Sequence, residues 1–305
     1  MNKIIINPEK KIGRIKPMHA VNNGPLDKAG SQIRSNFNTF KAAGIPYVRN
    51  HDASFCSSYG GEHTVDVGFI FPNFDNDPYD ENSYDFICTD AYLNIIEMAG
   101  SKVFYRLGSK IEHGVRKYGT LPPKDFYKWA VICEHIIRHY TEGWASGFHM
   151  DIEYWEIWNE PDLDDDDALD KRNWGGTTEE FYNLFAITAR HLKKCFPHLK
   201  IGGPALSRKS VEWTEGFLQY LTSGERVPLD FLTWHIYTYY PERILEFSSY
   251  YRGVLDKYGY TETESILNEW NYVKDWGANF VDSIKTIISM KGAAFTAACM
   301  CLCQN

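Results

Sequence analysis

Short apolar runs and longer amphipathic segments alternate along the whole chain. Runs rich in β-branched and aromatic residues predict strands, and apolar residues spaced three and four apart predict helices. The segment 53–84 is rich in Gly, Asn, Asp and Pro, and a loop of this length in a compact domain is usually functional. Strands are predicted at 14–21, 47–52, 103–107, 154–159, 201–205, 231–238 and 265–269, and helices at 31–43, 85–100, 126–140, 177–195, 211–222, 244–258 and 279–303.

The predicted strands are almost continuously apolar, which is typical of a parallel sheet covered by helices. Seven strand–helix units with polar strand ends favour an α/β fold of the (β/α)₈ TIM-barrel type over residues 1–305, as one domain. An open doubly wound sheet is the alternative, but no Gly-x-Gly-x-x-Gly motif follows the first strand.

The predicted barrel is one strand short, so we expect a chain that is truncated at its C-terminal end. The edges of the first and seventh strands would then expose backbone amides. A second copy of the chain or a rearranged C-terminal tail is expected to cover that gap.

Composition and charge argue against two classes of partner, nucleic acids and membranes. The net charge is −8 and no window resembles a basic stripe, which argues against a nucleic-acid partner. No transmembrane run is present, and the first residues are too short an apolar stretch for a signal peptide. We therefore expect no membrane partner and a cytoplasmic location, unless a leader has been removed.

The seven cysteines form no Cys-x-x-Cys pair, which makes a disulfide framework improbable. Cys299, Cys301 and Cys303 alternate, but a spacing of two on a helix directs side chains to different faces. The sequence therefore predicts no metal site and no cofactor.

Two carboxylates follow apolar strands in the same local arrangement. The fourth strand ends in Asn159-Glu160 and stops at Pro161, which has no amide to give to a sheet. The seventh ends in Asn268-Glu269. Because parallel strands bring their carboxyl ends to one face of a barrel, we expect the two Glu side chains to lie close together. Two facing carboxylates are the minimum equipment for cleaving a glycosidic bond.

Several polar residues could support this pair. Arg49, at the end of the second strand, is the candidate for holding the nucleophile Glu269 ionised. Asn159 is placed to bind the sugar hydroxyl next to the reacting carbon. His235 and Tyr237 share one face of the sixth strand, and could bind a sugar hydroxyl and hold the nucleophile, or pack in the core.

His19 and His51, near the ends of the first two strands, are further candidate sugar ligands. Glu156 has the same parity as Glu160 along its strand, and a buried carboxylate needs a cationic partner, for which we expect Arg106. A metal-dependent hydrolase would need clustered His and Asp residues at strand ends, and His51-Asp52 is the one near pair.

The motifs around these residues resemble glycoside hydrolase family 39, which contains β-xylosidases and α-L-iduronidases. The resemblance covers nearly the whole chain in order. It implies Glu160 as acid/base, Glu269 as nucleophile, and Asn159, His235 and Tyr237 as sugar ligands. The family continues into an eighth strand and a β-sandwich, and we expect both to be missing from residues 1–305. The resemblance rests on 70–75 (IFPNFD), 84–86 (YDF), 158–161 (WNEP), 233–237 (TWHIY) and 267–270 (LNEW).

These expectations combine into a retaining glycosidase, for which we expect an exo-β-xylosidase that acts on xylo-oligosaccharides. An iduronide, arabinoside or galactoside substrate is the alternative within the same chemistry. An iduronidase would need cationic groups for the substrate carboxylate, and the sequence shows no obvious cluster of them. A truncated barrel without activity is the non-catalytic alternative.

Overall fold

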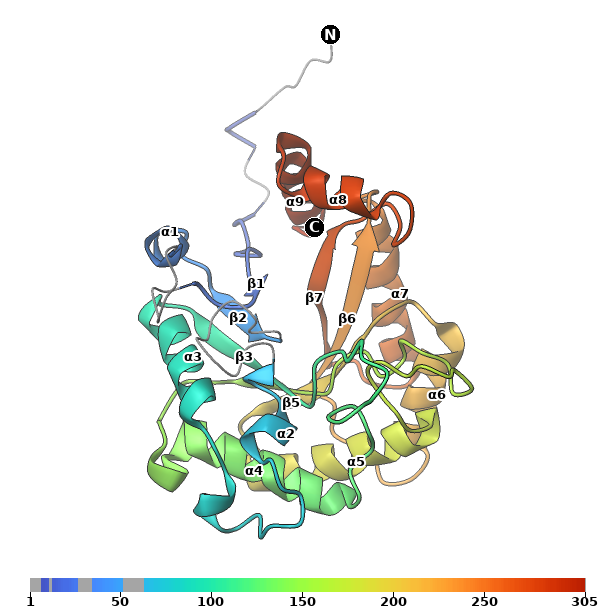
Figure 1. Cartoon of the computed structure of the whole chain (residues 1–305). Helices are drawn as coiled ribbons and strands as arrows, with labels where there is room; N and C mark the ends of the chain where they lie inside the picture. Colours follow the sequence, from blue (N-terminus) through green and yellow to red (C-terminus); the bar gives the residue numbers. More distant parts are fainter. Residues whose placement is uncertain (1–6, 11–12, 27–34, 52–62, 305) are drawn as a thin grey trace.

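The computed structural model describes residues 7–10, 13–26, 35–51 and 63–304. Within them, strands and helices alternate as the sequence pattern predicts (Figure 1). The strands are β1 Val21–Asn22, β2 Tyr47–Asn50, β3 Lys102–Leu107, β4 Tyr154–Ile157, β5 Lys200–Leu206, β6 Phe231–Thr238 and β7 Glu264–Tyr272. The helices are α1 Phe37–Ala42, α2 Val67–Ile70, α3 Ile87–Met98, α4 Phe126–Glu142, α5 Thr178–Cys195, α6 Val211–Thr222, α7 Arg243–Lys257, α8 Phe280–Ile287 and α9 Met290–Leu302, with short 3₁₀ turns at Glu81–Ser83 and Trp144–Ser146.

The strands form one parallel sheet in the order β1-β2-β3-β4-β5-β6-β7, which curls into a nearly closed barrel with helices outside (Figure 1). This confirms the α/β barrel and removes the doubly wound alternative, because sequential strands are neighbours throughout. The helix boundaries follow local chemistry. Thr177 and Glu180 form the predicted capping box at the start of α5, and Gly143, with φ of 76°, ends α4 in the left-handed conformation.

The N-terminal predictions were too long. The strand expected at 14–21 is reduced to the two residues of β1, because residues 13–17 are exposed and Pro17 has no amide to pair. The second strand ends at Asn50 rather than at 52. The helix expected at 31–43 is only α1, and residues 31–34 lie outside the described part, as do residues 53–62 of the predicted functional loop. The rest of that loop contains α2.

The C-terminal helix predicted over 279–303 is two helices, α8 and α9, bent by 78°. Ser289 begins α9 by accepting a hydrogen bond from the amide of Lys291, so the chain restarts there. The second helix packs on the outside of the barrel, where Phe295 meets the rings of Trp270 and Tyr272 on β7. Among the described helices, none alone is long and apolar enough to cross a membrane, and this bent pair reaches that level only by joint length and composition.

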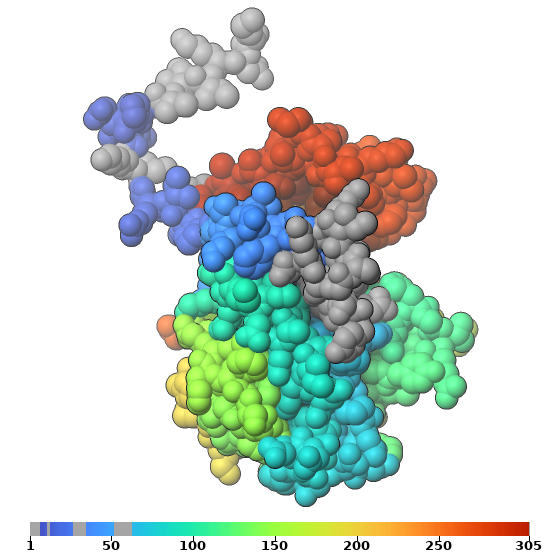
Figure 2. All heavy atoms as spheres, turned by 60° about the vertical axis from the view of Figure 1, so that its left-hand side comes forward, coloured from blue at the N-terminus to red at the C-terminus, as the bar shows by residue number. Residues whose placement is uncertain are grey.

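A cavity of about 770 Å³ lies between β1 and β7. Asn22 spans it at one point, where its Nδ2 donates to the carbonyl of Asn268 at 3.1 Å. The C-terminal tail covers part of it. Thr296 and Met300 of α9 line the cavity, and Gln304 exchanges hydrogen bonds with the backbone of residue 16. The C-terminal helices thus lie beside the N-terminal segment (Figure 2). Coverage by a second copy of the chain stays a prediction.

Candidate active site

Strand β4 presents Glu160 through an unusual backbone conformation. Trp158 and Glu160 have φ values of 74° and 47°, in the left-handed region that non-glycine residues rarely adopt. The surroundings hold this strained turn in place. The Glu160 amide donates to the carbonyl of Ala205 at 2.9 Å, and the buried Trp158 indole donates to the carbonyl of Asn173 at 2.8 Å. Strain of this kind clusters at functional sites.

Strand β7 presents Glu269 through a β-bulge. Trp234 of β6 pairs with Leu267, whereas the next residue, His235, pairs with Glu269, so Asn268 is an extra residue in β7. A bulge lets two consecutive side chains point to the same side of a sheet. Both Asn268 and Glu269 therefore reach the barrel interior, where the Asn268 amide donates to Glu156 at 2.7 Å.

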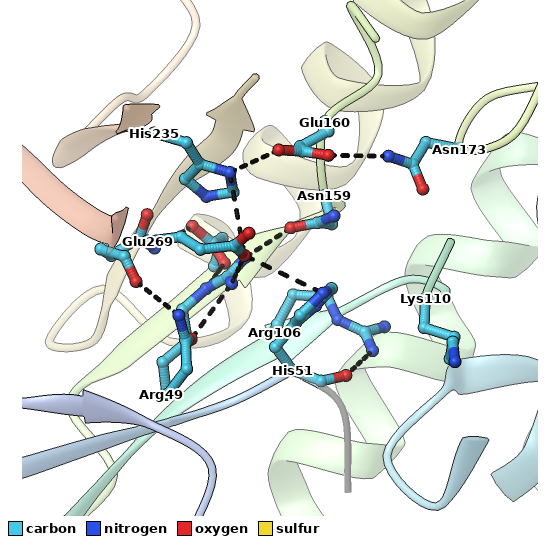
Figure 3. A network of polar contacts seen from close by, with 12 residues as sticks. Arg49, His51, Arg106, Lys110, Asn159, Glu160, Asn173, His235 and Glu269 are labelled. Carbon is cyan, nitrogen blue, oxygen red and sulfur yellow. Dashed lines mark hydrogen bonds and ion pairs between the residues drawn. The ribbon is translucent and has the colours of Figure 1, made fainter. Parts of the chain in front are cut away.

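The two predicted carboxylates lie together. One oxygen of Glu160, one oxygen of Glu269 and a ring nitrogen of His235 are all within 4.8 Å of one another. His235 Nδ1 is 2.8 Å from Glu160 Oε1 and 3.8 Å from Glu269 Oε2 (Figure 3). The other oxygen of Glu160 accepts a hydrogen bond from Asn173 Nδ2 at 3.1 Å. Glu160 is therefore held from two sides, and His235 bridges the pair.

Arg49 connects the site to the barrel interior. Its buried guanidinium donates to Glu156 Oε2 at 2.7 Å, to Asn159 Oδ1 at 2.8 Å and to Glu269 Oε2 at 3.2 Å. A fourth bond, at 3.3 Å, reaches Asn22 Oδ1 on β1. One cation therefore contacts both the buried Glu156 and the half-buried Glu269, which places Arg49 where the sequence predicts a cation beside the nucleophile.

The partner predicted for Glu156 was wrong. Arg106 is its neighbour in the β3–β4 register, but the Arg106 guanidinium pairs with Asp66 at 2.6 Å and donates to the carbonyl of His51 at 2.7 Å. Asp66 begins α2, and the sequence pattern gave no sign that this long segment returns to the barrel mouth. Because Asp66 occupies Arg106, the buried Glu156 is compensated by Arg49 instead.

Electrostatics favour an ionised Glu269. Burial raises the pKa of this carboxyl, but nearby His235, His51 and Arg49 and the Tyr237 hydroxyl, which donates to Glu269 Oε1 at 2.5 Å, together bring its pKa below the usual value. Burial and then Arg49 hold the pKa of His51 well below its ordinary range, so this ring is neutral near pH 7. The permanent positive charge beside Glu269 near pH 7 is therefore that of Arg49. Burial lowers the pKa of His235, but the two carboxylates outweigh it and the pKa is raised.

The remaining predicted ligands divide into two groups. His51 lies at the site, with Nε2 3.9 Å from Glu269 Oε2. The Oδ1 of Asn159 is bonded to Arg49, which leaves its Nδ2 to offer to a sugar. His19 does not join them. Its Nε2 is 3.0 Å from the carbonyl of Gly44, a residue that precedes β2 and so lies toward the opposite end of the barrel from the carboxylates.

Besides Asp66, sequence reasoning missed three residues of this region. Asn173 and Asn22 contact Glu160 and Arg49, yet both occur in loop-like sequence with no motif around them. Trp276 follows β7, and its ring lies 4.9 Å from that of Tyr237 while 64% of its surface stays exposed. An aromatic residue just after the strand that carries Glu269 was the available signal for Trp276, because barrel sites are built from such loops.

The sequence of this chain is similar to those of characterised glycosidases. Two are β-xylosidases. The one from Geobacillus stearothermophilus is 34% identical over 139 residues, which are 45% of this chain and 25% of that protein. The one from Caldicellulosiruptor saccharolyticus is 26% identical over 250 residues, 77% of this chain and 46% of that protein. The chain thus spans at most about half the length of the curated relatives it matches.

Solved structures show the same barrel. A glucosidase from Croceicoccus marinus superposes with a TM-score of 0.78 at 28% identity, over 94% of this chain and 56% of that one. A β-xylosidase of family 39 from Caulobacter crescentus shares the fold, with a TM-score of 0.59 at 18% identity, over 92% of this chain and 62% of that one. The sequence model of the family described as glycosyl hydrolases family 39 matches residues 4–280 of this chain. This chain therefore belongs to glycosyl hydrolase family 39.

Proposed function

We propose that this barrel cleaves O-glycosidic bonds with retention of configuration, by double displacement. The observation that carries the proposal is the separation of the two carboxylates, whose oxygens lie within 4.8 Å of each other. Retaining glycosidases hold their carboxyl groups about 5–5.5 Å apart, whereas inverting enzymes need about 6.5–9.5 Å to admit a water molecule between carboxylate and sugar. The spacing in this chain supports the shorter class.

The proposed mechanism follows from the surroundings of each carboxylate. Glu269, kept ionised by Arg49 and oriented by Tyr237, attacks the anomeric carbon and forms a glycosyl–enzyme bond. The bond to the leaving oxygen breaks as Glu160 gives that oxygen its proton. In the second step the Glu160 carboxylate takes a proton from water, whose oxygen attacks the anomeric carbon and releases Glu269.

Xylose is the proposed sugar, with xylo-oligosaccharides as substrates and release from the chain end. The support is the pair of β-xylosidase relatives. A glucoside is the second candidate, because the Croceicoccus marinus structure that resembles this chain over 94% of its length is a glucosidase. Trp276 offers an exposed ring beside Tyr237 against which a sugar can stack, and stacking serves either sugar.

Covalent trapping tests the proposal. The chain is incubated with a 2-deoxy-2-fluoro-xylosyl donor that carries a good leaving group, or with the matching glucosyl donor, and the adduct is located by peptide mass spectrometry. We expect one adduct on Glu269, and none in Glu269→Gln. Glu264→Gln is the matched control, since Glu264 is on the same strand but pairs with Lys200 at the other end of the barrel.

The two donors decide the sugar class by their relative trapping rates. The same experiment is run on a version of the protein extended beyond residue 305. An adduct on Glu269 in the extended protein, and none in the 305-residue chain, would mean that the catalytic assignment is right and that these 305 residues do not suffice for the reaction. No adduct on either protein with either donor, or an adduct on another residue, would overturn the assignment of Glu269.

A further inference from the structure

A second group of chemically active side chains lies outside the barrel, between helices α4 and α5, which run side by side (Figure 1). It consists of Glu134 on α4 and of His191 and Cys195 on α5. The two α5 residues are four apart and therefore share one face of that helix. One donor atom from each of the three residues lies within 4.8 Å of the other two. None of the three contacts the carboxylate pair of the candidate active site.

The geometry brings all three donors to one point. His191 Nε2 is 2.6 Å from Glu134 Oε2 and 3.8 Å from Cys195 Sγ. A cysteine nucleophile activated by a His–Glu relay needs the thiol at one ring nitrogen and the carboxylate at the other. Here the same nitrogen faces both groups, so the arrangement does not suit a relay. Convergence of a thiol, an imidazole and a carboxylate suits a shared cation.

The charge and the solvent access of these three residues also suit a bound cation. Hydrogen bonding from His191 dominates the lowering of the Glu134 pKa, to about 2, so this carboxylate is ionised near neutral pH. Arg138 donates a hydrogen bond to Glu134 Oε1 at 2.8 Å, which leaves Glu134 Oε2 facing the other two donors. Glu134 and His191 each keep 12% of their side-chain surface exposed, so an ion can reach them from solvent. Burial raises the pKa of the Cys195 thiol, so binding must release a proton.

We propose that Glu134, His191 and Cys195 bind a zinc ion, with water as the fourth ligand. Zinc prefers tetrahedral sites built from these three ligand types, at about 2.0–2.3 Å. Tetrahedral nitrogen and oxygen ligands at these distances are about 3.4 Å apart. His191 Nε2 and Glu134 Oε2 therefore need to separate by less than about 1 Å, whereas Cys195 Sγ already lies far enough from the ring nitrogen. The Cys195 thiol loses its proton to solvent as the sulfur–zinc bond forms. Such an ion joins α4 to α5 and stabilises the barrel wall that carries β4, the strand of Glu160.

The test uses the full chain, freed of metal with a chelator and dialysed. Zinc is titrated by calorimetry, and cobalt(II) is added separately as a spectroscopic probe. Only a thiolate ligand gives the near-ultraviolet charge-transfer band of cobalt, so this band distinguishes the Cys195 site from oxygen and nitrogen ligands elsewhere. We expect one zinc per chain, a cobalt–thiolate band, and release of a proton on binding near pH 7.

Variants locate the site. Cys195→Ser is expected to abolish the band and the zinc-dependent rise in thermal midpoint, while Cys301→Ser, which changes an exposed thiol of α9, keeps both. Glu134→Gln, which leaves the thiol intact, is expected to weaken zinc binding at least about tenfold. The proposal is overturned if the wild-type chain binds no zinc, or if the band persists in Cys195→Ser. Should Cys195→Ser fail to fold, unchanged zinc affinity in Glu134→Gln overturns it equally.

Discussion

The most demanding test of the site's electrostatics is the removal of its central cation. In Arg49→Met, the aliphatic part of the side chain is kept and the charge is lost. Among the residues that the structure describes, the fully buried Glu156 then keeps only the hydrogen bond from Asn268, and Glu269 loses its guanidinium contact. A carboxylate left unpaired in the interior must stay charged at a high desolvation cost or take up a proton.

The burial of the Arg49–Glu156 pair sets the expected loss of unfolding free energy in Arg49→Met. Breaking a buried ion pair by removing one partner costs about 3–5 kcal/mol, which is a large part of the roughly 5–15 kcal/mol that stabilises a typical domain. Glu156→Gln should cost less, because Arg49 keeps its bonds to Asn159 and Glu269. In the double variant no charge is stranded at Glu156. We therefore expect a coupling free energy of about 2 kcal/mol or more between the two positions.

The assay is guanidinium unfolding of the wild type, both single variants and the double variant, compared at constant m-value. Lys102→Met is the control, because Lys102 forms an exposed pair with Asp151, for which about 0–1 kcal/mol is expected. A cost below about 1 kcal/mol for Arg49→Met, or costs at the two positions that add within about 0.5 kcal/mol, would refute the reasoning that one arginine compensates Glu156.

Two further predictions concern the neighbourhood of Glu160. Burial, and to a lesser extent the negative charge of Glu160, raises the pKa of Asp162 to about 6. The cost in stability therefore grows as the pH rises from about 4, the pKa of an unfolded Asp, to about 6 and stays constant above that. Asp162→Asn, whose Oδ1 can still accept from the Ser207 amide, should stabilise the protein at pH 7 by up to about 3 kcal/mol. In chemical unfolding this gain should vanish below about pH 4, and a gain that is independent of pH would contradict the explanation. Asn173→Ala removes the hydrogen bond that orients Glu160, so kcat/KM should fall at least about tenfold for alkyl glycosides, whose leaving groups need the proton. It should stay nearly unchanged for aryl glycosides with activated leaving groups, and an equal loss for both substrate classes would indicate a merely structural role.

Local sequence chemistry was enough to predict the frame of the site. Apolar strands separated by amphipathic helices have few ways to bury their surfaces, and sequential parallel strands place all their carboxyl ends on one face. Glu160 and Glu269 could therefore be paired from their positions at strand ends alone. Arg49, His235 and Tyr237 followed for the same reason, since each stands on an inward-facing position near that face.

Other features depended on the tertiary structure, because they arise from contacts between segments far apart in the chain. The bulge at Asn268 turns two consecutive side chains inward, and the strand pattern of period two cannot express this. The choice of Arg49 over Arg106 as the partner of Glu156 depends on Asp66, which a long loop returns to the barrel mouth.

The convergence of Glu134, His191 and Cys195 shows the same division. The spacing of the last two on one helix can be read from the sequence, whereas the arrival of a carboxylate from α4 depends on how two helices pack. Periodicity determines which face of an element is buried. Which charges meet across buried faces is determined only when the whole chain has packed, because each buried charge takes whatever partner the fold places within reach.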